Sequence, residues 1–278
     1  TKNKIKFLVC ENLNKSLAQK IDNNSVGFSF GSAWIFKKKF IKKFNGRFFN
    51  IHASNLPEGR GGGGFSWQIL MDYKTLTICI HRLEPGIDKG EIIFKNDFKL
   101  LDNSLPLDIQ KIYEIEAKKI FMKKIKFLFN LNLKGKKQDE NKSIYWPRMN
   151  LKIHGWINWN WTANEIFRFI KSFDDPYDGA QTKLNNQTVY LKKCNIVKSK
   201  KNFHPFQNGL IFRKNKNLIC VSCKDSILAF KKILNKDKKN IPLSKIKIGD
   251  RFYTPLKVLE KALSTRVFYD SSGKAKKV

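Results

Sequence analysis

Acidic side chains are scarce in this chain. It has 23 aspartates and glutamates against 55 lysines and arginines, which gives a formal net charge of +32 over 278 residues. A polyanionic partner, such as a nucleic acid or a nucleotide-linked molecule, is one explanation of this charge. The lysines are scattered along the whole chain, however, which favours a lysine-rich composition without a specific role. Arginine is rare beside lysine, which argues against dense bidentate phosphate recognition.

Long apolar runs are also missing, because no segment approaches the roughly 18 apolar residues that span a bilayer. The opening residues TKNKIKFLVCENLNK contain too short an apolar piece for a secretory signal. The five cysteines form an odd set without disulfide spacing; they are Cys10, Cys79, Cys194, Cys220 and Cys223. We therefore expect a cytoplasmic protein with no membrane partner. A hydrophobic content of 41% is enough for a folded core.

The first half of the chain alternates between strand and helix patterns. Residues 25–30 form a short apolar run, residues 34–44 follow a turn and favour a helix, and residues 47–52 form a second apolar run. Residues 75–83 alternate between two faces, and residues 91–100 can pair with them as a hairpin. The order predicts an α/β fold.

A long helix is predicted over residues 107–129, with a buried stripe of Ile112, Ile115, Met122, Ile125 and Phe129. The polar residues 133–143 that follow are expected to form a linker. A second unit begins near Tyr145. Within it, Thr162 and Glu165 have the spacing of a capping box, which opens a short helix buried through Ile166, Phe167, Ile170 and Phe173.

Short strand patterns fill the rest of the second unit, which predicts a small barrel or sandwich. We therefore expect four regions: a catalytic domain at 1–132, a linker at 133–144, a small mostly-β, OB-like domain at 145–270, and a frayed tail at 271–278.

Polar residues gather where the strand at 47–52 ends. Asn50 and His52 are two residues apart, so on a strand they point to the same face. Asp88 lies in the turn-rich segment EPGIDKG after the alternating strand. An amide donor, an imidazole and a carboxylate together suit direct group transfer to an amine, with an oxyanion stabilised by Asn50 and His52. No serine or cysteine lies in a G-x-S-x-G turn as a nucleophile.

Three separated motifs occur in order around these residues: NIHASNLPEGRG at 50–61, TICIHR at 77–82 and GIDKGEII at 86–93. This pattern resembles the N10-formyltetrahydrofolate-dependent formyltransferases, a family that includes methionyl-tRNA, glycinamide ribonucleotide and sugar N-formyltransferases. The later text INWNWTANEIFRFIKSFDDPYDGAQT resembles the carboxy-terminal region of the tRNA and sugar members. The resemblance covers most of the chain from Ser25.

The resemblance implies a Rossmann-like catalytic domain, a transferase of one-carbon metabolism and a role for each matching residue. Asn50 and His52 would hold the formyl oxygen, and Asp88 would assist the histidine and collect the amine proton. N10-formyltetrahydrofolate would be the co-substrate. The implied folate contacts are Phe30, Gly31, Ser54, Asn55, Leu56, Pro57, Leu83 and Glu84.

The chain departs from the family pattern at three places. The family usually has leucine where Asn55 stands, and it lacks the run of four glycines after Arg60. That run would be either a flexible rim of the acceptor site or a tight path between strand and helix. Only 49 residues precede Asn50, so we expect an amino-terminal segment of the family to be missing.

Several residues have simpler interpretations. His81 is expected to be a structural strand residue. The pair Cys220 and Cys223 forms a single C-x-x-C in an apolar strand, so no metal site is expected. The tryptophans at 156, 159 and 161 could stack on a sugar or base, but we expect two of them in the core.

The acceptor stays open between two branches of the family. The carboxy-terminal text favours a nucleotide-linked 4-amino sugar, and the net charge favours initiator methionyl-tRNA. A third alternative, of a different class, is a catalytically inactive basic binding module. The sequence sets no oligomeric state.

Overall fold

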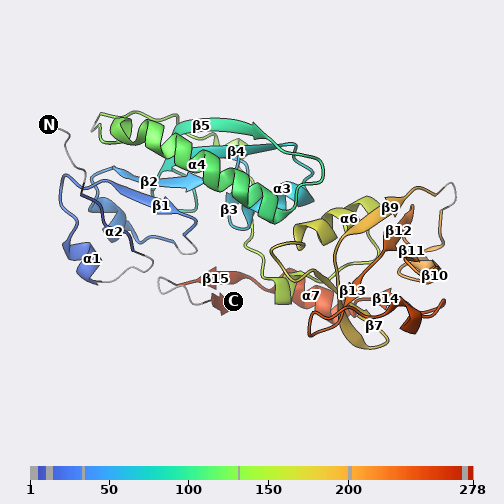
Figure 1. Ribbon diagram of the computed structural model, residues 1–278. Coiled ribbons are helices and arrows are strands. Elements are labelled where there is room, and N and C mark those ends of the chain that lie inside the picture. The colour runs from blue at the N-terminus through green and yellow to red at the C-terminus, as the bar shows by residue number, and fades with distance from the viewer. Residues whose placement is uncertain are drawn as a thin grey trace.

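The computed structural model describes residues 6–10, 15–32, 35–130, 132–199, 202–270 and 275–277. An α/β part is followed by a mostly-β part (Figure 1), which confirms the predicted fold class. The elements of the first part are α1 (Lys15–Gln19), β1 (Gly27–Phe30), α2 (Lys38–Lys42), β2 (Phe48–His52), β3 (Arg60–Gly61), α3 (Gly64–Leu70), β4 (Thr75–Arg82), β5 (Ile92–Lys99) and α4 (Pro106–Leu128).

Four strands of the first part form one sheet in the order β1-β2-β4-β5. β1 and β2 run parallel, whereas β2, β4 and β5 pair antiparallel, so the predicted hairpin is confirmed. Strand β4 is buried on both faces. Leu76, Ile78 and Ile80 share a core with α4, and on the other face Cys79 Sγ contacts the carbonyl oxygen of Ser54. The register of β2 on β4 places Asn50 directly opposite His81.

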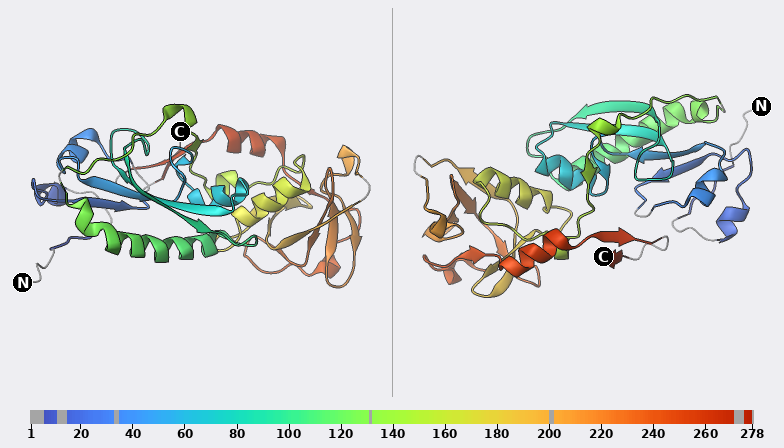
Figure 2. Two further views of the ribbon diagram at one scale, coloured as in Figure 1. Left: turned by 90° about the horizontal axis from the view of Figure 1, so that it is seen from above. Right: turned by 180° about the vertical axis from the view of Figure 1, so that it is seen from behind.

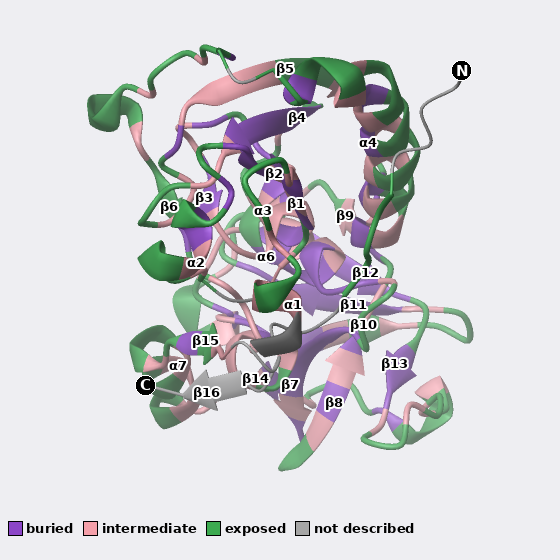
Figure 3. Cartoon of the chain, turned by 90° about the vertical axis from the view of Figure 1, so that its left-hand side faces the viewer, coloured by how far each residue is buried: buried purple, intermediate pink, exposed green. Residues whose placement is uncertain are grey.

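Helix α4 lies on the sheet with one buried and one exposed side (Figure 3). Of the predicted stripe, Ile112 packs against the core. The predicted Ile115 and Met122 are 55% and 65% exposed, and Phe129 is also exposed. Ile109, Ala117, Ile120 and Leu128 are buried in their place. Apolar side chains occur on several sides of this helix, so its spacing alone does not select the buried side. Contact with the apolar face of β4 selects it.

The second part is built from two four-stranded antiparallel sheets with strand orders β10-β11-β12-β9 and β13-β8-β7-β14. Its elements are η1 (Glu140–Lys142), β6 (Tyr145–Trp146), α5 (Leu151–His154), α6 (Ala163–Ser172), β7 (Ala180–Leu184), β8 (Gln187–Leu191), β9 (Cys194–Val197), η2 (Pro205–Gln207), β10 (Ile211–Lys214), β11 (Ile219–Ser222), β12 (Ile227–Phe230), β13 (Ile233–Leu234), η3 (Leu243–Lys245), β14 (Phe252–Tyr253), α7 (Leu256–Ser264), β15 (Val267–Tyr269) and β16 (Ala275–Lys277).

Helix α6 belongs to the second part and also contacts the first part. The Thr162–Glu165 capping box is present, as predicted. Its buried side includes the predicted Ile166, Ile170 and Phe173, but Phe169 is buried where Phe167 was expected. Helix α6 also packs against α3 of the first part. At this junction Ser66 Oγ donates a hydrogen bond to the carbonyl oxygen of Ser172 over 2.8 Å.

The predicted linker is tied to the first part. Lys136 forms a bridge with Ile92, and β6 pairs with β3 in parallel. The polar composition of this segment therefore does not mark a free connection. The boundaries that we expect at 133 and 145 stay a prediction.

The carboxy-terminal end returns toward the first part, as two further views show (Figure 2). Strand β15 follows α7, and its backbone pairs antiparallel with β16. Residues 275–277 are thus paired rather than frayed, while the rest of the expected tail lies outside the described residues. Within the described ranges, no helix is long and apolar enough to cross a membrane.

Candidate functional site

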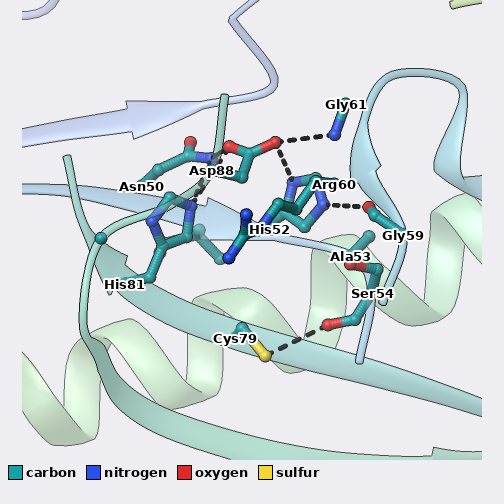
Figure 4. A network of polar contacts seen from close by, with 12 residues as sticks. Asn50, His52, Ala53, Ser54, Gly59, Arg60, Gly61, Cys79, His81 and Asp88 are labelled. Atoms are coloured by element: carbon teal, nitrogen blue, oxygen red, sulfur yellow. Dashed lines mark hydrogen bonds and ion pairs between the residues drawn. The ribbon is translucent and has the colours of Figure 1, made fainter. Parts of the chain in front are cut away.

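Strand β2 ends in a cluster of polar side chains from three elements (Figure 4). The alternation of the strand places Asn50 and His52 on one face, as predicted. His81 comes from the neighbouring strand β4, and Asp88 comes from the turn between β4 and β5. The structure therefore brings the three predicted catalytic residues together and adds His81 to them.

Asn50 is held by two partners. Its Nδ2 atom lies 3.1 Å from His81 Nε2 and 3.4 Å from Asp88 Oδ1. His81 Nδ1 lies 2.9 Å from the carbonyl oxygen of Arg82, so we assign the hydrogen to Nδ1 and leave Nε2 as the acceptor for Asn50. The fully buried His81 thus fixes the amide with its nitrogen toward Asp88, while Asn50 Oδ1 points away from the cluster in Figure 4. This is the structural role expected for His81, although it acts directly on the site.

His52 is oriented by the backbone. Its Nε2 atom lies 2.9 Å from the carbonyl oxygen of Gly59 and therefore carries a hydrogen. Its Nδ1 atom faces Asp88 Oδ2 at 3.8 Å. This separation is longer than a hydrogen bond. Nδ1 is consequently the atom of His52 that is available to take or give a proton.

Asp88 is an ionised carboxylate in a nearly enclosed place. Burial alone would raise its pKa, but the attraction to His52 and the N–H of Gly61 outweigh burial and hold the pKa of Asp88 well below its usual range. The Gly61 nitrogen donates to Asp88 Oδ2 over 2.9 Å. A carboxylate held in this way orients positive charge well but is a weak base.

The glycine run after Arg60 follows a tight path between β3 and α3, and residues 61–64 also line the cavity beside the cluster. Gly61 has a φ of +111°, and a Cβ atom there would lie 2.3 Å from the carbonyl oxygen of Trp146. A Cβ atom on Gly62 would meet the side chain of Arg148 at 2.9 Å. The glycines thus let the chain pass close beneath residues 146–148 on its way into α3.

A cavity of about 920 Å³ opens beside the cluster and is lined by Asn50, His52 and Asp88. Its volume lies in the range of small-molecule sites. Of the predicted folate residues, Gly31, Leu83 and Glu84 line the cavity. Apolar side chains line it too, among them Ile35, Phe36 and Phe40.

The other predicted folate residues do not line the cavity; they are Phe30, Ser54, Asn55, Leu56 and Pro57. Ser54 and Leu56 are buried in the protein, at 0% and 1% exposed. The Ser54 hydroxyl donates to the carbonyl oxygen of Glu58 over 3.0 Å. The side chains of Ser54 and Leu56 are turned into the core and support the loop behind His52, so only their backbone could contact the folate; that this stretch lies along the folate stays a prediction.

Several residues of the cavity went unnoticed in the sequence. Tyr113 on α4 donates its hydroxyl hydrogen to the carbonyl oxygen of Ile51 over 2.9 Å, and burial raises its pKa. Tyr145, Arg148 and Tyr177 line another stretch of the wall, together with Tyr269 of β15. The guanidinium of Arg148 lies 5.2 Å from the ring centre of Tyr269. These residues lie far apart in the sequence, so no local motif could have joined them.

The structure also shows where the cysteines and tryptophans of the second part lie. Cys220 and Cys223 are buried thiols, and burial raises the pKa of Cys223 to about 12. The described residues contain no group of three His, Cys, Asp or Glu side chains that could hold a metal ion. Trp159 stacks on Phe252 in the core, Trp161 packs against that core, and Trp156 is half-buried.

Comparisons with known proteins show that this chain is similar to formyltransferases. Residues 151–251 match the family described as formyl transferase, C-terminal domain. Methionyl-tRNA formyltransferase of Clostridium tetani is 29% identical over 190 residues, which cover 68% of this chain and 60% of that protein. The chain spans only 58% to 64% of three such curated relatives.

Two solved structures share the fold. The sugar 3N-formyl transferase WlaRD, solved in the presence of dTDP and 5-N-formyl-THF, has 27% identity and a TM-score of 0.59, and the match covers 77% of this chain and 76% of that one. The N-formyltransferase from Helicobacter canadensis, in complex with folinic acid and dTDP-3-aminofucose, has 23% identity and a TM-score of 0.62, with 79% and 78% covered. At this identity the second likeness shows the fold alone.

Proposed function

We propose that the chain is a formyltransferase, which transfers a formyl group from N10-formyltetrahydrofolate to a primary amine. The acceptor that we propose is the amino group of a nucleotide-linked amino sugar, and the compartment is the cytoplasm. The observation that supports the reaction most is the cluster of Asn50, His52 and Asp88 on the wall of one cavity.

The chemistry follows from the roles of these three residues. The amine nitrogen attacks the formyl carbon, and negative charge develops on the formyl oxygen. Asn50 Nδ2 can donate to this oxygen if it exchanges its long 3.4 Å contact with Asp88 for the oxyanion. The bond from the formyl carbon to N10 of the folate then breaks, which leaves the formamide on the acceptor.

The proton of the attacking amine needs a base. Asp88 is less suited to it than the family resemblance implies, because its carboxylate is held ionised by its surroundings. His52 Nδ1 is free of a close hydrogen bond and can take the proton, then return one to the leaving N10. Asp88 orients this ring and attracts the positive charge that it gains.

The folate would lie at the end of the cavity that the first part of the chain provides. Backbone near Gly31 and at Leu83 and Glu84 offers polar groups, and Ile35 and Phe36 offer an apolar surface for a flat ring. This mixture of a few polar groups within an apolar wall is what a pterin requires. The residues present therefore fit the co-substrate.

The wall near β15 supports the sugar-nucleotide acceptor. Arg148 provides a positive charge, and Tyr145, Tyr177 and Tyr269 provide aromatic faces beside it. A guanidinium binds phosphate oxygens, and aromatic faces stack on a base or a sugar. A nucleotide diphosphate with an attached amino sugar presents both kinds of group.

Methionyl-tRNA is the second candidate acceptor. The net charge of +32 favours it, and so does the similarity to methionyl-tRNA formyltransferases. A catalytically inactive binding module is the third candidate, and the complete Asn50, His52 and Asp88 set argues against it.

An acceptor panel separates these candidates. The chain would be incubated with N10-formyltetrahydrofolate and with 3-amino and 4-amino sugar nucleotides or charged initiator tRNA, each over a salt series. We expect formylation of a sugar nucleotide that changes little with salt. Formylation of the tRNA alone, with affinity falling steeply as salt rises, would establish the second candidate. Folate binding without transfer to any acceptor would favour the third.

A further inference from the structure

The segment that its composition predicted to be a linker reaches back into the site. Gln138 Nε2 donates hydrogen bonds to the carbonyl oxygens of Asp88 and Gly90, each over 2.7 Å. These two carbonyls lie on either side of Lys89, so a single amide holds the turn that carries the Asp88 side chain. Gln138 itself does not line the cavity.

The direction of the Gln138 amide is fixed by Arg60. The Arg60 Nε and Nη2 atoms donate to Gln138 Oε1 over 3.1 Å and 2.9 Å. Arginine can only donate, so Oε1 must face Arg60 and Nε2 must face the turn. Arg60 is 3% exposed, and Glu140 completes its pairing with two contacts of 2.8 Å and 2.9 Å.

The turn needs this support because its backbone is unusual. Asp88 has a φ of +48°, in the left-handed region that a residue with a Cβ atom seldom adopts. Gly90 passes so close to β4 that a Cβ atom there would lie 1.8 Å from the carbonyl oxygen of Arg82. Asp88 is therefore held at its carboxylate by Gly61 and at its backbone by Gln138.

The hydrogen bonds that Gly61 and Gln138 make to Asp88 both depend on strand β3. Arg60 and Gly61 are consecutive residues of β3, and β3 pairs with β6 immediately after the segment that contains Gln138. We propose that Gln138, oriented by Arg60, is a positioning residue that sets the place of the Asp88 carboxylate against His52 and Asn50. The effect on turnover rests on the proposed formyl transfer, whereas the effect on Asp88 does not.

The test replaces Gln138 by methionine, which keeps the length of the side chain and removes the two hydrogen bonds that it donates and the two that it accepts from Arg60. The matched control is Gln181→Met. Gln181 is a buried glutamine that donates to the Leu151 carbonyl oxygen in the second part, away from the cavity. Both variants lose a hydrogen-bonded amide, half-buried at Gln138 and buried at Gln181, but only Gln138 contacts the Asp88 turn.

The first readout is amide hydrogen exchange, measured by NMR without any substrate. The Gly61 N–H reports on Asp88 directly because it donates to the carboxylate, and the Gly62 N–H reports on the β3–β6 pairing because it donates to Trp146. We expect Gln138→Met to speed exchange at Gly61 by about tenfold or more, with Gly62 unchanged. Unchanged exchange at Gly61 in a folded variant would overturn the proposal.

The second readout is the division between kcat and KM in the formyl-transfer assay. Misplacing Asp88 should lower kcat by about 10- to 100-fold and leave both KM values nearly unchanged, while Gln181→Met keeps the wild-type kcat. Equal kcat losses in both variants would show a general effect of stability and overturn the proposal. If the wild type transfers no formyl group, the proposed function fails, and the exchange at Gly61 still decides the positioning role.

A second substitution covers the case in which Gln138→Met does not fold. Gln138→Glu keeps the pairing with Arg60 but turns a carboxylate oxygen toward the two carbonyls. The repulsion should release the turn, and exchange at Gly61 should rise as in the methionine variant. Wild-type exchange in Gln138→Glu would contradict the proposal.

Discussion

The amide nitrogen of Gly61 lies 2.9 Å from Asp88 Oδ2 and donates a hydrogen bond to it. This contact joins the glycine run to the catalytic cluster. The same glycine has a left-handed φ and passes against the carbonyl oxygen of Trp146. Glycine is therefore required at position 61, because a residue with a side chain could not bring its N–H to Asp88 along this path.

Replacing Gly61 by alanine should destabilise the protein and misplace Asp88. The left-handed backbone alone costs about 1–3 kcal/mol, and the overlap with Trp146 adds to this. Gly31→Ala is the control, since its φ is +61° and no atom lies within 4 Å of the added Cβ. Urea unfolding should show a much smaller loss for Gly31→Ala. Equal losses would mean that the contact with Trp146 is not tight in solution.

Replacing Asp88 by asparagine should lower kcat by about 10²- to 10⁴-fold with the fold intact, because the ring of His52 loses its charged partner. A wild-type circular dichroism spectrum and a cooperative urea transition would show that folding is kept. Wild-type turnover in this variant would remove Asp88 from the mechanism.

The same variant gives a prediction about pH. The pKa of Asp88 is lowered in the folded state, so its charge adds stability that is fully present above the ordinary aspartate pKa of about 3.9 and is lost as the pH falls below it. The difference in unfolding free energy between wild type and Asp88→Asn should be constant from about pH 5 upward and shrink in more acidic solution. A difference that grows on acidification would show that the pKa is raised instead.

Replacing His52 by glutamine should abolish most turnover and leave folate binding unchanged. The glutamine can still donate to the Gly59 carbonyl oxygen but cannot accept a proton, so we expect a loss of about 10²-fold or more in kcat. His204→Asn is the control, because His204 only caps the short helix η2. Folate titration by fluorescence checks binding. Loss of folding in His52→Gln would show that the ring is needed for the core instead.

Arg148→Gln should weaken binding of the acceptor and leave binding of the folate unchanged. Loss of a charge-assisted contact to phosphate raises the acceptor KM by about tenfold or more, whereas the folate KM changes little. Arg213→Gln is the matched control, since Arg213 also lies over an aromatic ring, Phe212, in the second part. A rise in the folate KM instead would place the folate, not the acceptor, at this wall.

The strands and the shared face of Asn50 and His52 were predictable because they depend on local patterns, whereas Asp88 was joined to them only through the family resemblance. Apolar runs at 48–52 and 75–82 gave β2 and β4, and the two-residue spacing of Asn50 and His52 placed both on one face. The capping box at Thr162 is likewise a local signal.

Other features depend on contacts that no local pattern contains. The buried side of α4 was predicted only in part, because contact with β4, not the helix itself, selects it. Gln138 looked like part of a polar linker, since nothing nearby shows that Arg60 and the Asp88 turn receive its hydrogen bonds. Ser54 and Leu56 lie in the motif that resembles a folate-binding stretch, but their side chains are buried and support the loop.

Transfer of a labelled formyl group tests the proposed reaction and the role of Asp88 together. N10-[¹³C]formyltetrahydrofolate would be mixed with the chain and an equimolar set of amino-sugar nucleotides, and the labelled formamide would be followed by NMR in wild type and in Asp88→Asn. The proposed mechanism predicts a labelled sugar nucleotide from the wild type and about 10²-fold slower labelling from the variant. Equal labelling by both proteins, or none by a wild type that binds the folate, would contradict it.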